Sequence, residues 1–196
     1  PPDGAAEDGR PMTDTITLLK TRRSIPAVNI VEPGPSEAEI EEMLTIAARV
    51  PDHGKLTPWR FILFTGEARA AAGEATAALL KERRPEIDDK ALHAERNRFT
   101  RSPLVVAVVS RAAPHVKIQE WEQLLSGAAA AMNLVIAANA MGYSTQWLTE
   151  WVTYDADARA ILGHAPDERL IELIHIGTAD IPPFERPRPT LADIVT

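Results

Sequence analysis

PDHGKLTPW, residues 51–59, runs directly into the apolar segment RFILFT at residues 60–65. A proline near each end bounds a polar loop, because proline lacks the backbone N–H that helices and central strands require. The apolar segment after it predicts a buried β-strand. Within the loop His53, Lys55 and Thr57 alternate, so an extended backbone would turn all three to one side, where they can donate hydrogen bonds to a ligand. Taken singly, each is an ordinary loop residue.

Arg22-Arg23-Ser24 ends a short amphipathic helix that is predicted over residues 14–21. Two guanidinium groups and a hydroxyl offer directional donors to a phosphate monoester. The dipole of a helix also favours cations at its C-terminus without any ligand. Arg186 and Arg188 form a second basic pair, in a tail that its prolines stiffen. A tail of this composition is otherwise typical of an exposed extension, so both interpretations stay open.

The rest of the chain predicts an α+β domain. SEAE at residues 36–39 is a capping box at the start of a helix. The β-branched run at residues 104–109 predicts a strand, and residues 170–176 a last core strand. A long helix over residues 117–142 is apolar almost all round in its second half, which predicts burial on every side, at the centre of the domain or at a subunit interface. Strands and helices mix without strict βαβ repetition, which favours the α+β class.

TQWLTEW at residues 145–151 is a predicted strand or extended segment with two indoles. Trp147 and Trp151 could wall a pocket for a planar ligand. A strand with aromatic residues on one face that pack into the core explains the same pattern equally well.

Composition narrows the class of protein. The 196 residues contain no cysteine, which excludes disulfides, cysteine-ligated metals and thiol nucleophiles. The net charge of −7 gives no overall basic field for nucleic acid, and the longest apolar run is too short and polar for a membrane span. Residues 1–11 are expected to be a disordered extension without signal-peptide character, followed by a single domain over residues 12–196 in the cytoplasm. The motifs of Rossmann, Walker, zincin and hydrolase sites do not occur, and we expect no metal.

In order and spacing, three segments together resemble the nitroreductase family. They are LLKTRRS at residues 18–24, RVPDH through PW at residues 49–59, and IGT at residues 176–178. The Arg-x-Pro-Asp-His form is similar to the small single-domain bacterial branch of NAD(P)H nitroreductases. The resemblance covers essentially everything from Met12 to Val195.

The resemblance implies an α+β fold with a central, mostly antiparallel sheet flanked by helices. It also implies an intertwined homodimer with two FMN sites, each built from both chains. It assigns the ribityl phosphate to the basic residues and a hydroxyl, namely Arg22, Arg23, Ser24, Arg186 and Arg188.

The flavin ring is assigned to two other segments. Arg49 and His53 would come from the opposite subunit, with Lys55 at a ring-edge position where many relatives carry Asn. The segment beside the isoalloxazine ring, where a backbone N–H faces N5, would be Trp147, Leu148 and Thr149.

The implied activity is ping-pong oxidoreduction. NAD(P)H transfers hydride to FMN N5 and leaves, and a small acceptor such as a nitroaromatic or quinone takes its place. Because the cofactor carries the chemistry, no catalytic side chain is assigned. Specialised flavin chemistry on the same fold, a flavin-binding or redox-sensing protein with little turnover, and a structural α+β protein with ordinary surface arginines remain alternatives.

Overall fold

The computed structural model of the protein describes residues 14–196, so the predicted extension over residues 1–11 lies outside the described residues. The described residues form the helices α1 (Thr15–Thr21), α2 (Glu37–Ala47), α3 (Gly66–Arg83), α4 (Asp89–Arg96), α5 (Glu120–Ala140), α6 (Trp151–Tyr154) and α7 (Ala156–Ile161). Short 3₁₀ turns are η1 (Ala27–Asn29), η2 (His53–Lys55), η3 (Phe99–Arg101) and η4 (Leu191–Asp193). The strands are β1 (Ile30–Val31), β2 (Trp59–Phe64), β3 (Leu104–Ser110), β4 (Ser144–Leu148) and β5 (Arg169–Ala179).

The five strands form one sheet in which every pair is antiparallel. Its order is β1-β5-β3-β2, and β4 also pairs with β5. β5 is the longest strand and serves as the centre of the sheet, because it pairs with β1, β3 and β4. The predicted α+β class with an antiparallel central sheet is confirmed.

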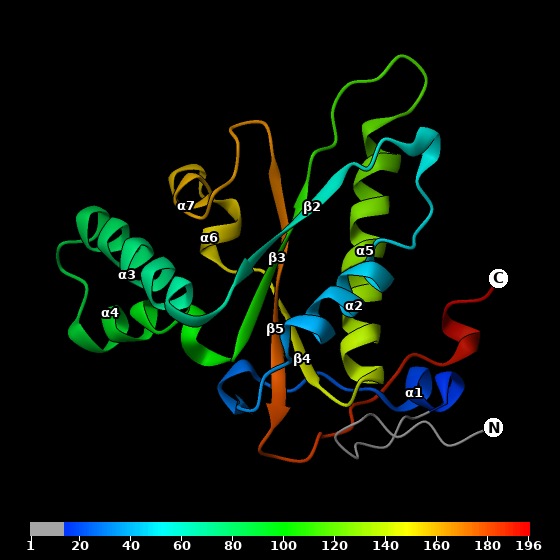
Figure 1. Ribbon diagram of the computed structural model, residues 1–196, viewed down its shortest axis with the longest axis horizontal. Helices are drawn as coiled ribbons and strands as arrows, with labels where there is room; N and C mark the ends of the chain where they lie inside the picture. The colour runs from blue at the N-terminus through cyan, green and yellow to red at the C-terminus, as the bar shows by residue number, and fades with distance from the viewer. Residues whose placement is uncertain (1–13) are drawn as a thin grey trace.

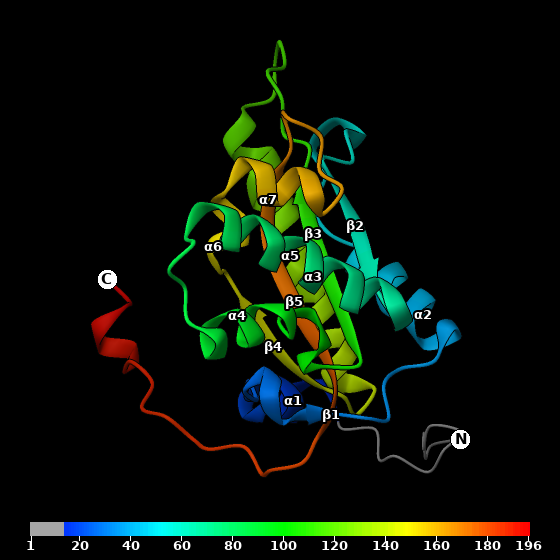
Figure 2. The same ribbon diagram turned by 90° about the vertical axis from the view of Figure 1, so that its left-hand side faces the viewer.

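Helices cover both faces of the sheet (Figure 1). β3 is buried along its whole length, and its side chains alternate between the two faces, as a strand requires. Its even-numbered valines pack with α2 and α5 in one core cluster, around Met43 and Leu134. Its odd-numbered residues pack with α3, α6 and α7 in the other, around Phe99. Figure 2 shows this second helical layer in front of the sheet.

Local capping residues set the start of several helices, and the predicted capping box is among them. Asp14 accepts hydrogen bonds from the backbone N–H groups of Ile16 and Thr17 at the start of α1. The Ser36–Glu39 capping box is present at the start of α2. Such side chains satisfy donors that the first helical turn leaves unpaired, so short local patterns suffice to place these ends.

Burial differs from the prediction in two elements. β2 is an edge strand that pairs only with β3, and Leu63 on it is 38% exposed, so the strand is half-buried rather than buried. α5 is not covered on every side within one chain, because Trp121, Leu125 and Met132 are exposed along one side. Apolar residues at this helical spacing form one face of α5, and the rest of the chain does not cover that face.

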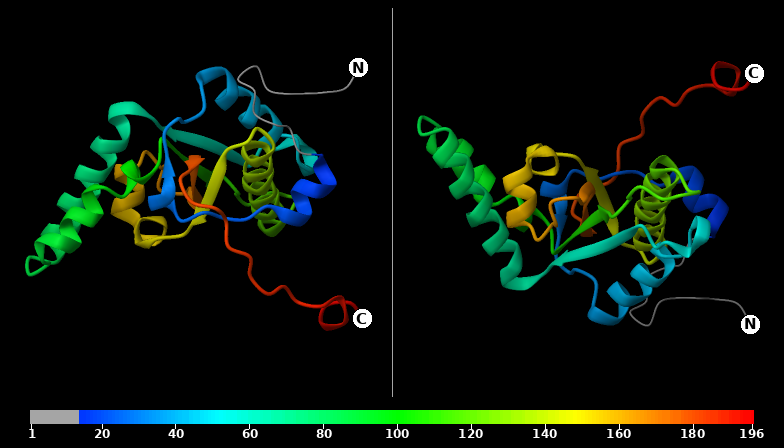
Figure 3. Two further views of the ribbon diagram at one scale, coloured as in Figure 1. Left: turned by 90° about the horizontal axis from the view of Figure 1, so that it is seen from below. Right: turned by 90° about the horizontal axis from the view of Figure 1, so that it is seen from above.

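α5 is also the one helix among residues 14–196 that is long and apolar enough to cross a membrane. Half of its most apolar stretch is buried inside the fold, as in the core helix of a domain. The tail after β5 leaves the body of the domain, as the two views of Figure 3 show. All of its residues from Pro182 onward are exposed.

Candidate functional site

The structure brings the four predicted phosphate-site arginines into one cluster. Arg22 is the C-cap of α1, and the tail passes beside it. Arg23 anchors the tail, because its Nε donates to the carbonyl of Phe184 at 2.7 Å. Glu185 lies between the cations, 3.6 Å from Arg23 Nε and 3.7 Å from the Nε of Arg188. Segments far apart in sequence therefore meet around a single acidic residue.

Arg22 carries a buried guanidinium nitrogen, Nε, without a hydrogen-bond partner among the described residues. Burial, and then the positive charges of Arg188, Arg23 and Arg186, lower the pKa of its guanidinium below the usual value. It borders a small cavity of about 170 Å³ with Tyr143 and other residues of α1, α5 and β4. A buried donor beside like charges costs free energy unless an anion joins it.

Ser144, at the start of β4, borders this cavity. The backbone N–H of Ile25 donates to the carbonyl of Thr145 at 3.1 Å, and that of Ala27 donates to the side chain of Gln146. The chain after the arginines therefore runs beside β4. From Ser144 to Leu148, β4 spans about 13 Å at the rise of a strand.

The predicted ring segment forms the end of β4 and the residue after it. Trp147 and Leu148 are half-buried, and Thr149 is exposed. Trp147 packs against the core cluster of α5, whereas Trp151 starts α6 and packs against the other cluster. The two indoles therefore lie on opposite sides of the sheet and wall no common pocket. The interpretation of both as one strand face is also wrong, because the chain turns into α6 at Trp151.

Glu172 is a buried carboxyl beside Trp147 that the sequence interpretation missed. It lies on β5, is 6% exposed, and its Oε2 has no hydrogen-bond partner among the described residues. Burial raises its pKa to about 7, although a hydrogen bond from Trp147 partly offsets this. In the sequence Glu172 is a single acid within an apolar strand.

The loop at residues 51–57 is tightly turned, so the prediction of an extended backbone is wrong. Gly54, Lys55 and Thr57 have φ values of 71°, 56° and 47°, in the left-handed region. The carboxylate of Asp52 accepts the backbone N–H groups of Leu56 and Thr57, each at 3.0 Å. This local carboxylate stabilises a conformation that costs a non-glycine residue free energy.

The side chains of this loop therefore diverge. His53 Nδ1 lies 2.8 Å from Glu122 Oε2 at the start of α5. Lys55 and Arg49 are exposed and form no ion pair among the described residues. The cationic side chains of Lys55 and Arg49 therefore face outward.

The arginine cluster and the loop lie at opposite ends of α5 (Figure 1). Glu122, which pairs with His53, is in the first turn of the helix. Asn139, which borders the Arg22 cavity, is in its last turn. Seventeen residues of α-helix separate the two by about 25 Å. One chain therefore does not bring the two predicted parts of the site together.

The described residues form an α+β domain with an antiparallel sheet and a small arginine-lined cavity at its edge. Residues 19–178 match the family described as Nitroreductase family, and the chain belongs to this family. It is 31% identical to "Putative NAD(P)H nitroreductase YdjA" of Escherichia coli (strain K12) over 170 residues, 86% of this chain and 90% of that protein. A "Putative NAD(P)H nitroreductase" of Haemophilus influenzae is 36% identical over 170 residues, 84% and 88% of the two chains.

Solved structures share the fold. A nitroreductase-like family protein from Bacillus cereus superposes with a TM-score of 0.78 at 22% identity, over 94% of this chain and 95% of that one. The FMN and NADPH-dependent nitroreductase NfnB from "sphigopyxis sp. strain HMH" gives a TM-score of 0.70 at 20% identity, over 94% of this chain and 98% of that one.

Proposed function

We propose that the protein is an FMN-dependent NAD(P)H oxidoreductase that reduces nitroaromatics, quinones or similar small acceptors. The observation that carries the proposal is the unpartnered, buried Nε of Arg22 in a cluster of four arginines with one acid. Phosphate matches this donor set, because guanidinium groups bind its oxygens with charge-assisted hydrogen bonds. Family membership and the FMN-dependence named for the relative NfnB support the same cofactor.

The residues present fit FMN along the length of β4. Arg22, Arg23 and Ser24, with Arg186 and Arg188 from the tail, would hold the phosphate. The backbone of residues 147–149 would border the ring. FMN, when bound, supplies the hydride chemistry between NAD(P)H and the acceptor. The protein then has to bind and orient the ring and leave one face open, which agrees with the lack of an assigned catalytic side chain.

We further propose a homodimer in which the 51–57 loop of one subunit completes the site of the other. Lys55 and His53, with Arg49 just before the loop, would contact the ring from across the interface. The exposed apolar side of α5, with Trp121, Leu125 and Met132, supports this arrangement, since its burial against a second copy would release apolar surface from water. Two copies packed antiparallel along α5 would place each loop near the other copy's arginine cluster.

We propose the cytoplasm as the site of action, since a chain without cysteine fits a reducing compartment. Substrates are proposed only as a class, because the open ring face rather than a dedicated pocket would receive them.

Titration with FMN followed by stopped-flow addition of NADH or NADPH tests the proposal. We expect the purified protein to bind FMN and either nicotinamide to bleach its visible absorption band, with recovery on addition of a nitroaromatic or quinone. Protein that binds FMN but is not bleached by either nicotinamide would indicate a flavin-binding protein with little turnover. Protein that does not bind FMN would contradict the proposal altogether.

A further inference from the structure

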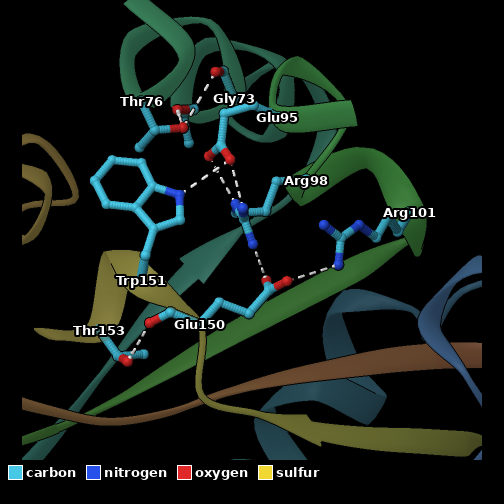
Figure 4. A network of polar contacts seen from close by, with 9 residues as sticks. Gly73, Thr76, Glu95, Arg98, Arg101, Glu150, Trp151 and Thr153 are labelled. Atoms are coloured by element: carbon cyan, nitrogen blue, oxygen red, sulfur yellow. Dashed lines mark hydrogen bonds and ion pairs between the residues drawn. The ribbon is translucent and has the colours of Figure 1, made fainter. Parts of the chain in front are cut away.

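A cluster of buried charges follows directly after the proposed ring segment (Figure 4). Glu150, the residue after Thr149, is 3.0 Å from Arg101 through its Oε1 and forms an ion pair with Arg98 through its Oε2. Arg98 and Arg101 come from η3 and the residue before it, so the ion pairs connect the end of β4 to a distant part of the chain.

A second acid completes the cluster. Glu95 of α4 accepts from Arg98 Nε at 2.7 Å and from the indole Nε1 of Trp151 at 3.0 Å. The side chains of Arg98 and Glu95 are only 9% and 4% exposed. Two arginines and two glutamates thus form a compact group whose formal charges cancel.

Glu150 keeps its charge at neutral pH. Burial alone would raise the pKa of Glu150, but the hydrogen bonds and charges of Arg98 and then Arg101 hold it below its usual value. His175 lies close to these groups and bonds Ser102 through Nδ1 at 2.9 Å. Burial lowers the pKa of His175 to about 4, so this imidazole is neutral and adds no charge at pH 7.

The supporting helices fix the cluster in place. A Cβ on Gly73 of α3 would lie 2.0 Å from the backbone oxygen of Arg96, so the two helices approach as closely as glycine permits. Thr76, one turn later, bonds back to the carbonyls of Ala72 and Gly73. A charge group on such a rigid support holds a constant position relative to β4.

We propose that the charge of Glu150, balanced by Arg98 and Arg101, sets the reduction potential of the bound flavin. This inference rests on the proposed function. The cluster presents cancelling charges one residue from the ring segment, within a poorly solvated region where charges act strongly. Reduction makes the flavin ring richer in electrons. A net positive charge beside it therefore favours the reduced form, and a net negative charge favours the oxidised form.

Charge-removing variants test the sign of this effect. We would measure the reduction potential of bound FMN by equilibrium titration against a reference dye in the wild type, E150Q, R101Q and the double variant E150Q/R101Q. E150Q leaves one uncompensated positive charge, and the potential should become more positive. R101Q leaves a negative charge, and the potential should become more negative. The reduction potential of FMN bound to the double variant should lie close to that of the wild type.

The size of the shift follows from Coulomb's law. A unit charge that acts over about 10 Å at an effective dielectric constant of about 20 would change the ratio of the dissociation constants for oxidised and reduced FMN on the order of tenfold. E74Q is the matched control, because Glu74 pairs with Arg96 at 3.2 Å between the same helices but is exposed. E74Q should leave the potential unchanged.

Opposite shifts in the two single variants support the proposal. Shifts in the same direction, no shift, or an equal shift in E74Q would overturn it. Loss of structure alone would not move the reduction potential in opposite directions in the two variants. If E150Q does not fold, R101Q still tests the inference, since Arg101 is one-fifth exposed. Failure of the wild type to bind FMN at all would instead contradict the proposed function.

Discussion

The Arg22 cavity and the loop at residues 51–57 lie at opposite ends of α5 and are built in different ways. The cavity gathers four arginines around Glu185 and leaves the Nε of Arg22 without a partner among the described residues. The loop satisfies its own polar groups, because Asp52 accepts two backbone N–H groups and His53 pairs with Glu122. In the proposed site the first region would gain free energy by binding an anion, whereas the second is held in shape by contacts within the chain. This difference suggests that the cavity would supply affinity for the FMN phosphate, and that the loop would place the flavin ring.

The largest expected effect comes from Glu172, a carboxyl group on β5 outside the Arg22 cavity, in contrast to Asp52 of the loop. Glu172, beside Trp147, has its pKa raised by burial to about 7, whereas two backbone donors satisfy Asp52. Unfolding lets Glu172 ionise near pH 4.5, so the folded state holds more protons between about pH 4.5 and 7. Its contribution to stability is therefore present at low pH and is lost as the pH rises to 7.

E172Q removes this dependence. Relative to E172Q, the wild type should lose about 3 kcal/mol of unfolding free energy from pH 4.5 to 7.5, at 1.36 kcal/mol per pKa unit. Urea denaturation at a series of pH values measures the difference between the two proteins. Parallel stability curves would show that Glu172 keeps an ordinary pKa.

The next effect concerns affinity at the cavity. R22A removes a charge-assisted phosphate contact of about 1.5–3 kcal/mol and should weaken FMN binding roughly ten- to a hundredfold. K20A is the control, because it removes a cation from the same exposed helix end but outside the cavity. Fluorescence titration of FMN measures both. Equal losses in the two variants would show that only general electrostatic attraction acts there.

A smaller effect tests the loop. Lys55 has a φ of 56°, which glycine adopts more easily than any other residue. K55G should therefore raise the unfolding free energy by about 0.5–1 kcal/mol while it weakens FMN binding. K55A removes the same side chain and keeps the backbone cost, so it should lose affinity without the gain in stability. K55G that is less stable than K55A would contradict the strained conformation.

The sequence predicted the features that depend on neighbouring residues. The capping box at residues 36–39 and the β-branched run of β3 specify their elements locally, and both are confirmed. The meeting of Arg22 with the tail was predicted through the family resemblance. Nothing in the local pattern of either segment indicated that Glu185 would lie between them.

Features that depend on distant contacts escaped prediction. The left-handed loop follows from one carboxylate, Asp52, and the alternation of side chains suggested the opposite backbone. The exposed side of α5 could not be distinguished from a fully buried helix, because periodicity does not reveal what covers a face. The Glu150 cluster joins parts of the chain about fifty residues apart in sequence, and charge spacing gave no sign of it.

Co-expression of two differently tagged variants tests most directly whether one site uses both subunits. One variant carries R22A, and the other carries H53A and K55A. Each homodimer should bind FMN weakly at both sites. In the mixed dimer, isolated through both tags, one site combines the intact arginine cluster of one chain with the intact loop of the other. We predict that mixed dimers bind FMN with wild-type affinity at one of their two sites, and mixed dimers with no restored site, or a wild type that is monomeric by light scattering, would contradict the account.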